Sequence, residues 1–471
     1  MSDPTAPLAG IDGASVGVLA VARADGESVA AGDGLASDDG GGEALASLDP
    51  DRALAPASNT KLVTSALALE ALGPGYAFET RVEGRGEREG NRLAGDLLVR
   101  GSGAPDLDGE DLRALADAVA AEVGAVAGDL LLDGTHFSGG RYGPGWTVGD
   151  RRYAYGAPSS ALALAGNAVE VRISDPEESG NFRVSVVPDS PEIAVETDLR
   201  AVEAGGESED GEADASDGNG DLRVVTDPDE GTIRVEGALP PGADRTERAP
   251  VVRPERHFGL ALLDALESAG VSVEGEVRAV ESADSTATDR DDVHAEEAFA
   301  CAVESAPVAD LLRSMNVPSD NFVAEQLART VAAECDGEGS WAAWESIATD
   351  FLEECGAAAC RLRDGSGLSR YNLVTARGMV GLLARADDAP WADAFFDSLP
   401  APGEGTLSSR LDGADGLRAK TGTLTATCAL SGVVRRDDDP DAFFSVVYGG
   451  LTVEADEARR RQDEFVRGLL K

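Results

Sequence analysis

The chain has 471 residues, which is enough for about three domains, and 42% of them are hydrophobic, which excludes global disorder. Its 87 Asp and Glu against 40 Lys and Arg give a formal net charge of −47, spread along the whole length, and this favours a hydrated surface in a salt-rich setting. Because so acidic a chain repels phosphates and anionic head groups, nucleic acid and membrane surfaces are excluded as partners.

The N-terminal elements are a hairpin and a buried helix. Residues 16–22 and 28–31 flank a polar Asp-Gly turn and predict two paired strands. Residues 58–72 predict a helix that is apolar on nearly every side, ended by the Gly-Pro-Gly at 73–75.

The middle of the chain is mainly β in texture. Short β-like runs such as 97–99 and 128–132 surround one amphipathic helix at about 111–123. Residues 204–221 are almost without apolar residues and predict an acidic flexible loop, to which we assign no chemistry.

The last third is helical and then ends in strands. Helices are predicted at 258–269 and through most of 308–386. The closing elements are three strands and a charged helix, at 419–425, 428–434, 443–451 and 454–470.

Strands at both ends with helices between them predict an α/β (α+β) domain interrupted by a mainly β insertion. We expect this domain to comprise 1–80 and 296–471, with 81–295 inserted. The insertion is expected to hold two small β-rich domains, one nested in the other at roughly 104–170.

The N-terminus and the cysteines indicate in which cellular compartment the protein is expected. Residues 1–20 lack the basic start and cleavage pattern of a signal peptide, and no run of eighteen apolar residues occurs, so a cytoplasmic protein without membrane insertion is expected. The five cysteines lack C-x-x-C spacing, so we expect neither a disulfide framework nor a metal site. Cys355 and Cys360 are near enough to pair, but buried thiols are the favoured interpretation.

The three histidines show no metal-ligand spacing. His136, His257 and His294 all lie in the predicted insertion, so no zinc site and no cofactor is expected. No nucleophile elbow, P-loop or dinucleotide-binding glycine pattern is present either.

Lysine is the scarce residue: of 40 basic residues only Lys61, Lys420 and Lys471 are lysines. Lys differs from Arg because its amine can lose its proton when it is desolvated. Lys61 closes a Ser-x-x-Lys pair with Ser58, and a spacing of three places both side chains on one helix face. Alone, this pair is a weak signal.

Two further motifs follow in a fixed order. Ser319-Asp320-Asn321 leads into a predicted helix at 322–333 and reads equally as a plain helix cap. Lys420-Thr421-Gly422-Thr423 lies on a predicted strand and reads equally as an edge-strand lysine before a turn. Together with Ser58 and Lys61 they form the signature of active-site serine penicillin-recognising enzymes, with the two internal lysines in its two lysine positions.

The flanking residues extend this resemblance to nearly the whole chain, from about 10 to 455. The segments 56–61, 364–370 and 418–424 resemble the class C low-molecular-mass penicillin-binding proteins, the peptidase S13 family of D-alanyl-D-alanine carboxypeptidases. Three segments of the insertion resemble that family too, at 128–133, 144–146 and 157–159. The resemblance implies a transpeptidase-like domain, an antiparallel sheet with helices on both faces.

The spacing separates the chain from class A β-lactamases. Ser58 and Ser319 are 261 positions apart, a gap that requires an insertion. No counterpart of the deacylating glutamate of class A enzymes is found. A β-lactamase or esterase on the same scaffold, or a catalytically silent binding scaffold, remain the alternatives.

The resemblance also implies roles. Ser58 is the expected nucleophile, Lys61 its general base, and Ser319 and Asn321 relay the proton and hold the substrate amide. Lys420 is expected to lower the pKa of Lys61 together with burial and to attract the substrate carboxylate.

The rest of the expected site binds substrate. The oxyanion would lie between the backbone N–H groups of Ser58 and Thr423, with Thr421, Gly422 and Thr423 receiving the carboxylate. Tyr153 and Tyr155 are expected to line the cleft. The implied reaction is hydrolysis of a D-Ala-D-Ala-type terminal bond through an acyl-enzyme, with endopeptidase activity as an extension. The expected partners are a D-amino-acid-terminated peptide and, as covalent inhibitor, a β-lactam.

Overall fold

The computed structural model describes residues 5–8, 11, 13–23, 43–202, 222–280, 296–357, 359–436 and 439–470. By contacts the chain divides into two compact units. Unit 1 comprises residues 1–77, 137–146 and 306–471, and unit 2 comprises 78–136 and 147–305. The boundaries expected from the sequence were 80/81 and 295/296.

Unit 1 is built on a five-stranded antiparallel sheet in the order β16-β17-β18-β1-β2. In chain order its strands are β1 (Ser15–Arg23), β2 (Glu43–Leu48), β16 (Leu417–Leu424), β17 (Thr427–Val434) and β18 (Asp441–Gly449). Every residue of β17 is buried, and so is nearly all of β18. Both strands are therefore central and read as continuous apolar runs.

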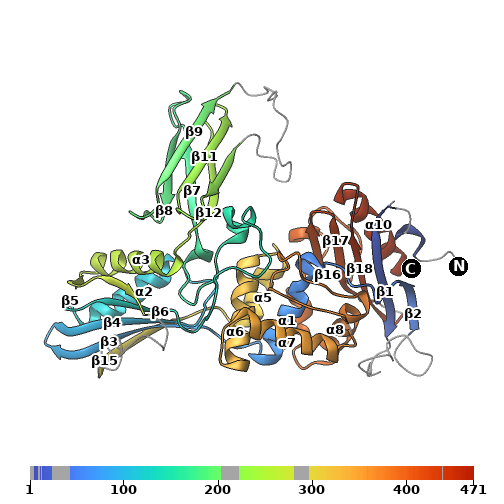
Figure 1. The fold of residues 1–471 in the computed structure, drawn as a ribbon, viewed down its shortest axis with the longest axis horizontal. Helices are drawn as coiled ribbons and strands as arrows, with labels where there is room; N and C mark the ends of the chain where they lie inside the picture. The colour runs from blue at the N-terminus through green and yellow to red at the C-terminus, as the bar shows by residue number, and fades with distance from the viewer. Residues whose placement is uncertain are drawn as a thin grey trace. The chain divides into compact units, whose positions relative to one another are not determined.

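Helices cover both faces of this sheet (Figure 1). On one face, α10 (Ala455–Leu469) packs Phe465 and Val466 into a cluster with alternate residues of the strands, such as Val18 and Phe444. The other face carries α8 (Ala376–Asp388), which contacts β1, β17 and β18. The predicted fold class is confirmed.

The remaining helices of unit 1 lie mostly between β2 and β16 in sequence. They are α1 (Thr60–Ala71), α5 (Val308–Asn316), α6 (Asn321–Asp336), α7 (Trp341–Glu354) and α9 (Ala392–Ser398). Helix α1 is buried from Thr60 to Leu69, and the chain leaves it through Gly73, whose φ of +83° is the left-handed conformation that glycine adopts without strain. The predicted buried central helix is thus present.

Unit 2 contains a seven-stranded mixed sheet with two helices. Its central path is β13-β5-β4-β3-β15, and β6 joins β4 to β14. The strands are β3 (Glu79–Glu89), β4 (Arg92–Gly101), β5 (Ala125–Val126), β6 (Leu130–Asp133), β13 (Ser272–Val273), β14 (Val277–Ala279) and β15 (Glu297–Glu304). Helix α2 (Gly109–Glu122) begins at a capping box formed by Asp108 and Asp111. Helix α3 (Pro254–Ser268) begins with proline in its first turn, four residues before the predicted start.

Two small three-stranded sheets complete unit 2, in the orders β10-β11-β9 and β12-β7-β8. Their strands are β7 (Ala168–Ser174), β8 (Arg183–Val187), β9 (Val195–Ala201), β10 (Arg223–Thr226), β11 (Ile233–Leu239) and β12 (Asp244–Pro250). They share one apolar cluster that includes Val171, Ile233 and Val235. This cluster spans 169–251, and the expected nested domain at 104–170 stays a prediction. Strands that alternate between buried and exposed residues carry a weak apolar signal in the sequence.

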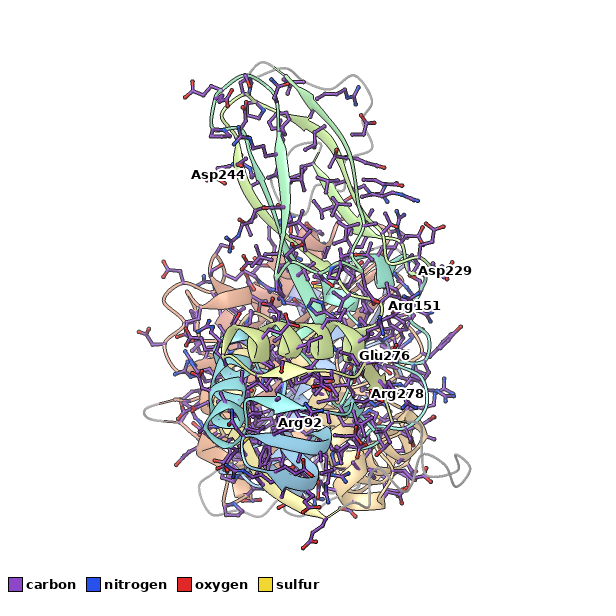
Figure 2. All side chains as sticks on the ribbon, turned by 90° about the vertical axis from the view of Figure 1, so that its left-hand side faces the viewer. Arg92, Arg151, Asp229, Asp244, Glu276 and Arg278 are labelled. Carbon is purple, nitrogen blue, oxygen red and sulfur yellow. The ribbon has the colours of Figure 1, made fainter. Side chains whose placement is uncertain are left out.

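Charged side chains cover unit 2 as ion pairs. Arg278 pairs with Asp129 at 2.9 Å, and Arg92 pairs with Glu274. Figure 2 labels Arg92 and Arg278 among the charged side chains of this unit. The arginine side chains are 49% and 40% exposed. In this unit, arginine side chains thus form exposed ion pairs at the surface of the sheet.

Several further expectations from the sequence can be compared with the structure. The predicted strand 28–31, the acidic loop 204–221 and His294 lie outside the described residues, and β1 pairs instead with β2. All five cysteines are free, so Cys355 and Cys360 do not pair. No helix in the described ranges is long and apolar enough to cross a bilayer.

Candidate active site

The start of α1 carries the first pair of site residues. One 3-10 turn, Ala57–Asn59, leads into α1, so Ser58 and Lys61 lie one turn apart. The Thr60 hydroxyl donates to the Ala57 carbonyl oxygen at 2.9 Å and fixes this turn. Ser58 is half-buried and Lys61 is completely buried. The hydroxyl is therefore the accessible member of the pair.

The Lys61 amine is surrounded by oxygen acceptors. Its Nζ donates to Ser58 Oγ at 3.2 Å, to Asn321 Oδ1 at 2.7 Å and to the Ser366 carbonyl oxygen at 2.8 Å. The three acceptors come from the 3-10 turn before α1, from the start of α6 and from a loop. The amine is thus held within reach of the serine proton.

Burial is the main cause of the shifted lysine pKa values. It lowers the pKa of Lys61 to about 8, although the carboxylates of Glu325, Asp320 and Asp364 act in the opposite direction. At pH 7 about a tenth of such an amine is neutral. The pKa of Lys420 is lowered first by burial and second by the charge of Lys61. The two lysine charges repel each other, and burial disfavours the charged form of both amines.

The Ser-Asp-Asn triplet combines a helix cap with two side chains that reach the lysines. Asp320 is the N-cap of α6 and accepts the N–H of Val323 at 3.1 Å. Ser319 has φ +67°, an uncommon conformation for a non-glycine residue, and turns the chain just before the helix. Asn321 opens the helix and accepts from Lys61. The cap fixes the directions in which Ser319 and Asn321 leave the backbone.

Lys420 lies on an edge strand and is nevertheless completely buried. Its Nζ donates to Ser319 Oγ at 3.0 Å and to the Thr421 carbonyl oxygen at 3.2 Å. The structure therefore brings the three predicted motifs together as two Lys–Ser pairs, Lys61 with Ser58 and Lys420 with Ser319.

Strand β16 approaches the start of α1 closely. A Cβ on Gly422 would lie 2.6 Å from the Pro56 carbonyl oxygen and 3.0 Å from the Ser58 nitrogen, so a larger residue does not fit. In the amide orientation that satisfies both of its neighbours, the Asn59 side chain donates to the Lys420 carbonyl oxygen at 2.8 Å and accepts from Ser431 Oγ at 2.7 Å. These contacts hold the backbone of Ser58 beside the strand that continues into Thr423.

Glu325 supports the site and was missed in the sequence. It is fully buried and accepts the N–H groups of Gly365 at 3.1 Å and of Ser366 at 2.8 Å. These bonds orient the Ser366 carbonyl that Lys61 contacts. Burial raises the pKa of Glu325. Its sequence signal was its position four residues after Asn321, which places the two side chains on the same helix face.

Asp364 organises the loop that carries Ser366. It accepts from Trp146 Nε1 at 2.8 Å, from Asn372 Nδ2 at 2.6 Å, and from the backbone N–H groups of Gly367 and Ser369 at 3.0 and 2.6 Å. Segments 144–146 and 364–370, known from the sequence only by their resemblance to the family, are therefore structural support for the lysine.

Ser58 opens into a cavity of about 700 Å³. Its lining is polar and includes residues of all three motifs and of α10: Ser58, Ser319, Thr406, Ser409, Arg410, Thr421, Gly422, Thr423, Asp456, Arg459, Arg460 and Asp463. A polar peptide end fits such a cavity better than an apolar ligand does.

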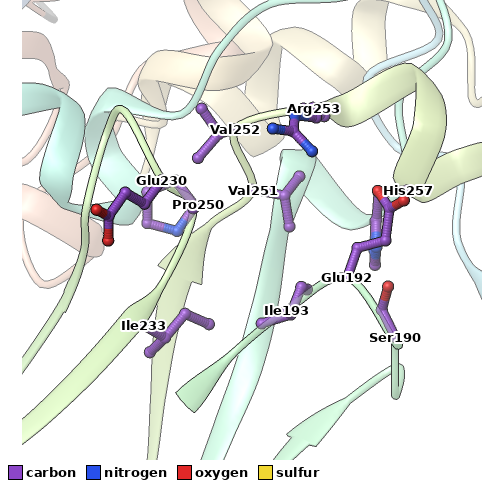
Figure 3. Close-up of a pocket in the computed structure, with 11 residues that line it drawn as sticks. Ser190, Glu192, Ile193, Glu230, Ile233, Pro250, Val251, Val252, Arg253 and His257 are labelled. Atoms are coloured by element: carbon purple, nitrogen blue, oxygen red, sulfur yellow. The ribbon is translucent and has the colours of Figure 1, made fainter. Parts of the chain in front are cut away.

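A much smaller cavity, about 30 Å³, lies in unit 2 and has a different character (Figure 3). His257 and Ser190 border it, both more than nine-tenths buried. Within the described residues neither ring nitrogen of His257 has a hydrogen-bond partner. Burial lowers the pKa of His257 to about 4, so the ring is neutral at pH 7.

The other candidate residues belong to unit 2. Tyr153 and Tyr155 stack with ring centres 5.5 Å apart in unit 2, and Tyr155 is 48% exposed. Their expected place in the cleft stays a prediction. His136 and His257 also belong to unit 2. The part of the chain that the structure describes contains no cluster of three or more metal-ligating side chains.

The comparisons with known proteins agree on one family. The sequence model described as the D-Ala-D-Ala carboxypeptidase 3 (S13) family matches residues 19–469. A D-alanyl-D-alanine carboxypeptidase of Actinomadura sp. is 37% identical over 423 residues, which cover 87% of this chain and 76% of that protein. The D-alanyl-D-alanine carboxypeptidase DacB of Haemophilus influenzae is 26% identical over 446 residues, covering 88% and 85%. The crystal structure of penicillin-binding protein 4 from Haemophilus influenzae matches with a TM-score of 0.78 and 24% identity, covering 99% and 98%.

Proposed function

The chain belongs to the D-Ala-D-Ala carboxypeptidase 3 (S13) family and is a serine-type D,D-peptidase, and from that premise we propose that Ser58 is its nucleophile and Lys61 its general base. The observation that carries the assignment is the buried Lys61 amine, 3.2 Å from Ser58 Oγ, with its pKa lowered to about 8. A neutral amine in this position takes the serine proton as the hydroxyl attacks.

In the first half of the reaction Ser58 Oγ attacks the carbonyl carbon of the penultimate D-alanine. The hydroxyl proton passes to Lys61 Nζ, and the backbone N–H groups of Ser58 and Thr423 stabilise the oxyanion. The C–N bond then breaks, and the terminal D-alanine leaves as an amine after it receives a proton. An ester between Ser58 and the remaining peptide is left.

The proton for the leaving amine comes through the second pair. Ser319 Oγ accepts from Lys420 Nζ at 3.0 Å, so its own hydroxyl proton is free to point toward the leaving nitrogen, and Lys420 restores it. Asn321 holds the substrate amide, while Thr421 and Thr423 receive the carboxylate. Lys61 then gives up the proton that it took from Ser58 and Lys420 regains one, by exchange through solvent, so both amines return to their starting states. Water attacks the ester as Lys61 takes its proton, Ser58 Oγ recovers that proton from Lys61, and the peptide acid is released.

The substrate class is a peptide that ends in a D-amino acid, and β-lactams act as covalent inhibitors. Support comes from relatives: the Haemophilus influenzae protein of the same fold is named a penicillin-binding protein and has been solved in complex with a β-lactam. Endopeptidase activity on cross-linked peptides stays a prediction, to be measured beside the carboxypeptidase activity.

Labelling with a fluorescent penicillin tests the assignment. Wild type forms a stable adduct on Ser58 and releases D-alanine from an acyl-D-Ala-D-Ala peptide, and Ser58→Ala does neither. Ser102→Ala, a serine of unit 2, is the matched control and keeps both activities. Equal labelling of Ser58→Ala would remove Ser58 from the mechanism, and rapid release of hydrolysed penicillin by wild type would favour a β-lactamase.

A further inference from the structure

The cavity at Ser58 reverses the charge balance of the chain. Acidic residues outnumber basic ones about twofold overall, yet three arginines and two aspartates line this cavity. The arginines are Arg410, Arg459 and Arg460. The reversal matters because the substrate carries a carboxylate, which the field of the whole protein repels.

Arg459 is the arginine of these three that reaches the Lys-Thr-Gly-Thr segment. Its Nη2 donates to Thr423 Oγ1 at 3.3 Å, and its Nη1 pairs with Asp456 Oδ1 at 2.9 Å. The side chain is 39% exposed, whereas that of Asp456 is 83% exposed. The guanidinium thus stands at the threonine that receives the carboxylate, with an exposed and weakly held partner.

The other two arginines are engaged elsewhere. Arg410 is bound to Asp463 at 2.6 Å and to Gln462 at 3.2 Å, and only 12% of its side chain is exposed. Arg460 pairs with Glu457, one turn back on α10. Arg410 also donates to the Arg459 carbonyl oxygen at 3.3 Å, which ties that turn of the helix to the cavity wall.

We propose that Arg459 is a specificity-determining residue that binds the C-terminal carboxylate of the peptide substrate beside Thr423. The inference rests on the proposed function, because it takes the carboxylate to lie at Thr421 and Thr423. An arginine fork presents two parallel N–H groups to a carboxylate, and such charge-assisted bonds are about twice as strong as neutral ones. On substrate binding the carboxylate takes the place of Asp456 at the fork.

Arg459→Gln tests this with two peptides that differ only at the end, acyl-D-Ala-D-Ala with a free carboxylate and its C-terminal amide. For the free acid we expect kcat/KM to fall roughly 10- to 100-fold, since one charge-assisted contact is lost. For the amide, which has no charge for the arginine to bind, kcat/KM stays unchanged. An equal fall for both peptides, or no fall for either, overturns the proposal.

Two variants separate substrate binding from fold and general charge. Asp456→Asn removes the same ion pair but keeps the guanidinium, so the preference for the free acid is expected to persist or rise. If Asp456→Asn instead reproduced the loss, the ion pair would matter only as structure and the proposal would fail. Arg467→Gln removes one positive charge from the same helix, where Arg467 contacts the Asp412 carbonyl, and is expected to leave both peptides unaffected.

The same assay distinguishes failure of the inference from failure of the proposed function. A wild type that cleaves neither peptide and takes no penicillin contradicts the proposed function itself. A wild type that is labelled by penicillin at Ser58 and cleaves acid and amide equally well contradicts only the role of Arg459.

Discussion

Unit 1 and unit 2 use positive charge in opposite ways. Unit 1 buries Lys61, Lys420 and Arg329 almost completely. Unit 2 contains no lysine at all, and several of its arginines pair with carboxylates near the surface, as Arg278 does with Asp129. A buried charge costs several kcal/mol unless partners compensate it, so the buried cations of unit 1 need a reason that the surface pairs of unit 2 do not.

The buried cations of unit 1 also differ from one another in whether they can lose a proton. Arg329 cannot lose its proton, and it donates to three fixed carbonyl oxygens, those of Ser138, Gly140 and Gly339. Lys61 and Lys420 can lose a proton, and burial lowers both pKa values. The difference teaches that arginine is used where charge must persist and lysine where charge must change.

The largest expected effect is that of exchanging the cation in unit 1. Lys61→Arg keeps the positive charge but removes the base, so the rate of acylation by penicillin is expected to fall about 10³-fold. The converse exchange in unit 2, Arg278→Lys, is expected to leave acylation unchanged. Intact-protein mass spectrometry over time measures the acylation rates of both variants and tests these two expectations. If Lys61→Arg were acylated at the wild-type rate, exchanging a cation would have no larger effect on acylation in unit 1 than in unit 2.

The second largest effect is expected from loss of the buried arginine, Arg329. Arg329→Met removes one donor from each of three carbonyl oxygens, although Gly140 keeps the Trp341 indole N–H and Gly339 keeps the Ser138 N–H. We expect it to lower the free energy of unfolding of unit 1 by about 3 kcal/mol. All four tryptophans, Trp146, Trp341, Trp344 and Trp391, belong to unit 1. Urea unfolding followed by tryptophan fluorescence therefore reports this unit. A change below about 0.5 kcal/mol, the scale of a surface substitution, would show that burial does not distinguish this arginine.

A pH-dependent effect is expected in unit 2, from its buried neutral histidine (Figure 3). The pKa of His257 is lowered to about 4 in the folded chain, against about 6.5 when unfolded. Its stabilising effect is complete above pH 6.5 and declines as the pH falls toward 4, because protons then bind the unfolded chain preferentially. Between pH 7 and pH 5 the loss amounts to about 2 kcal/mol.

Thermal unfolding by circular dichroism at the two pH values measures this effect. The difference between pH 7 and pH 5 should shrink in His257→Leu, which cannot titrate there. If wild type and His257→Leu lost the same stability, the histidine would be paired or hydrated in the folded protein.

The smallest effect is expected at the surface of unit 2. Arg278→Ala breaks an exposed pair with Asp129 and is expected to cost about 0.2–1 kcal/mol, a loss that molar salt reduces further. Hydrogen exchange of strand β14 with and without salt checks it. A loss as large as that of Arg329→Met, or one insensitive to salt, would mean that unit 2 also depends on individual cations.

The elements that could be predicted from the sequence are those with strong periodicity or distinctive residues. Strands β17 and β18 were found because residues buried on both faces form continuous apolar runs. The motifs around Ser58, Ser319 and Lys420 were found because lysine is rare, and the structure brings them within hydrogen-bond distance.

What could not be predicted depends on contacts distant in sequence. The strands between Ala168 and Pro250 alternate with exposed residues, so their separate apolar cluster was not visible. Glu325 looked like any helical glutamate, since only the folded chain brings it to Ser366. The reach of Arg459 to Thr423 likewise follows from the packing of α10 against the sheet.

The central claim is that Lys61 acts as a neutral base, and the pH dependence of acylation by penicillin tests it most directly. The second-order rate constant of wild type should rise with pH through about 8 and then level off, while Lys61→Arg should remain slow at every pH. A wild-type rate that is constant from pH 6 to pH 10 would contradict the claim.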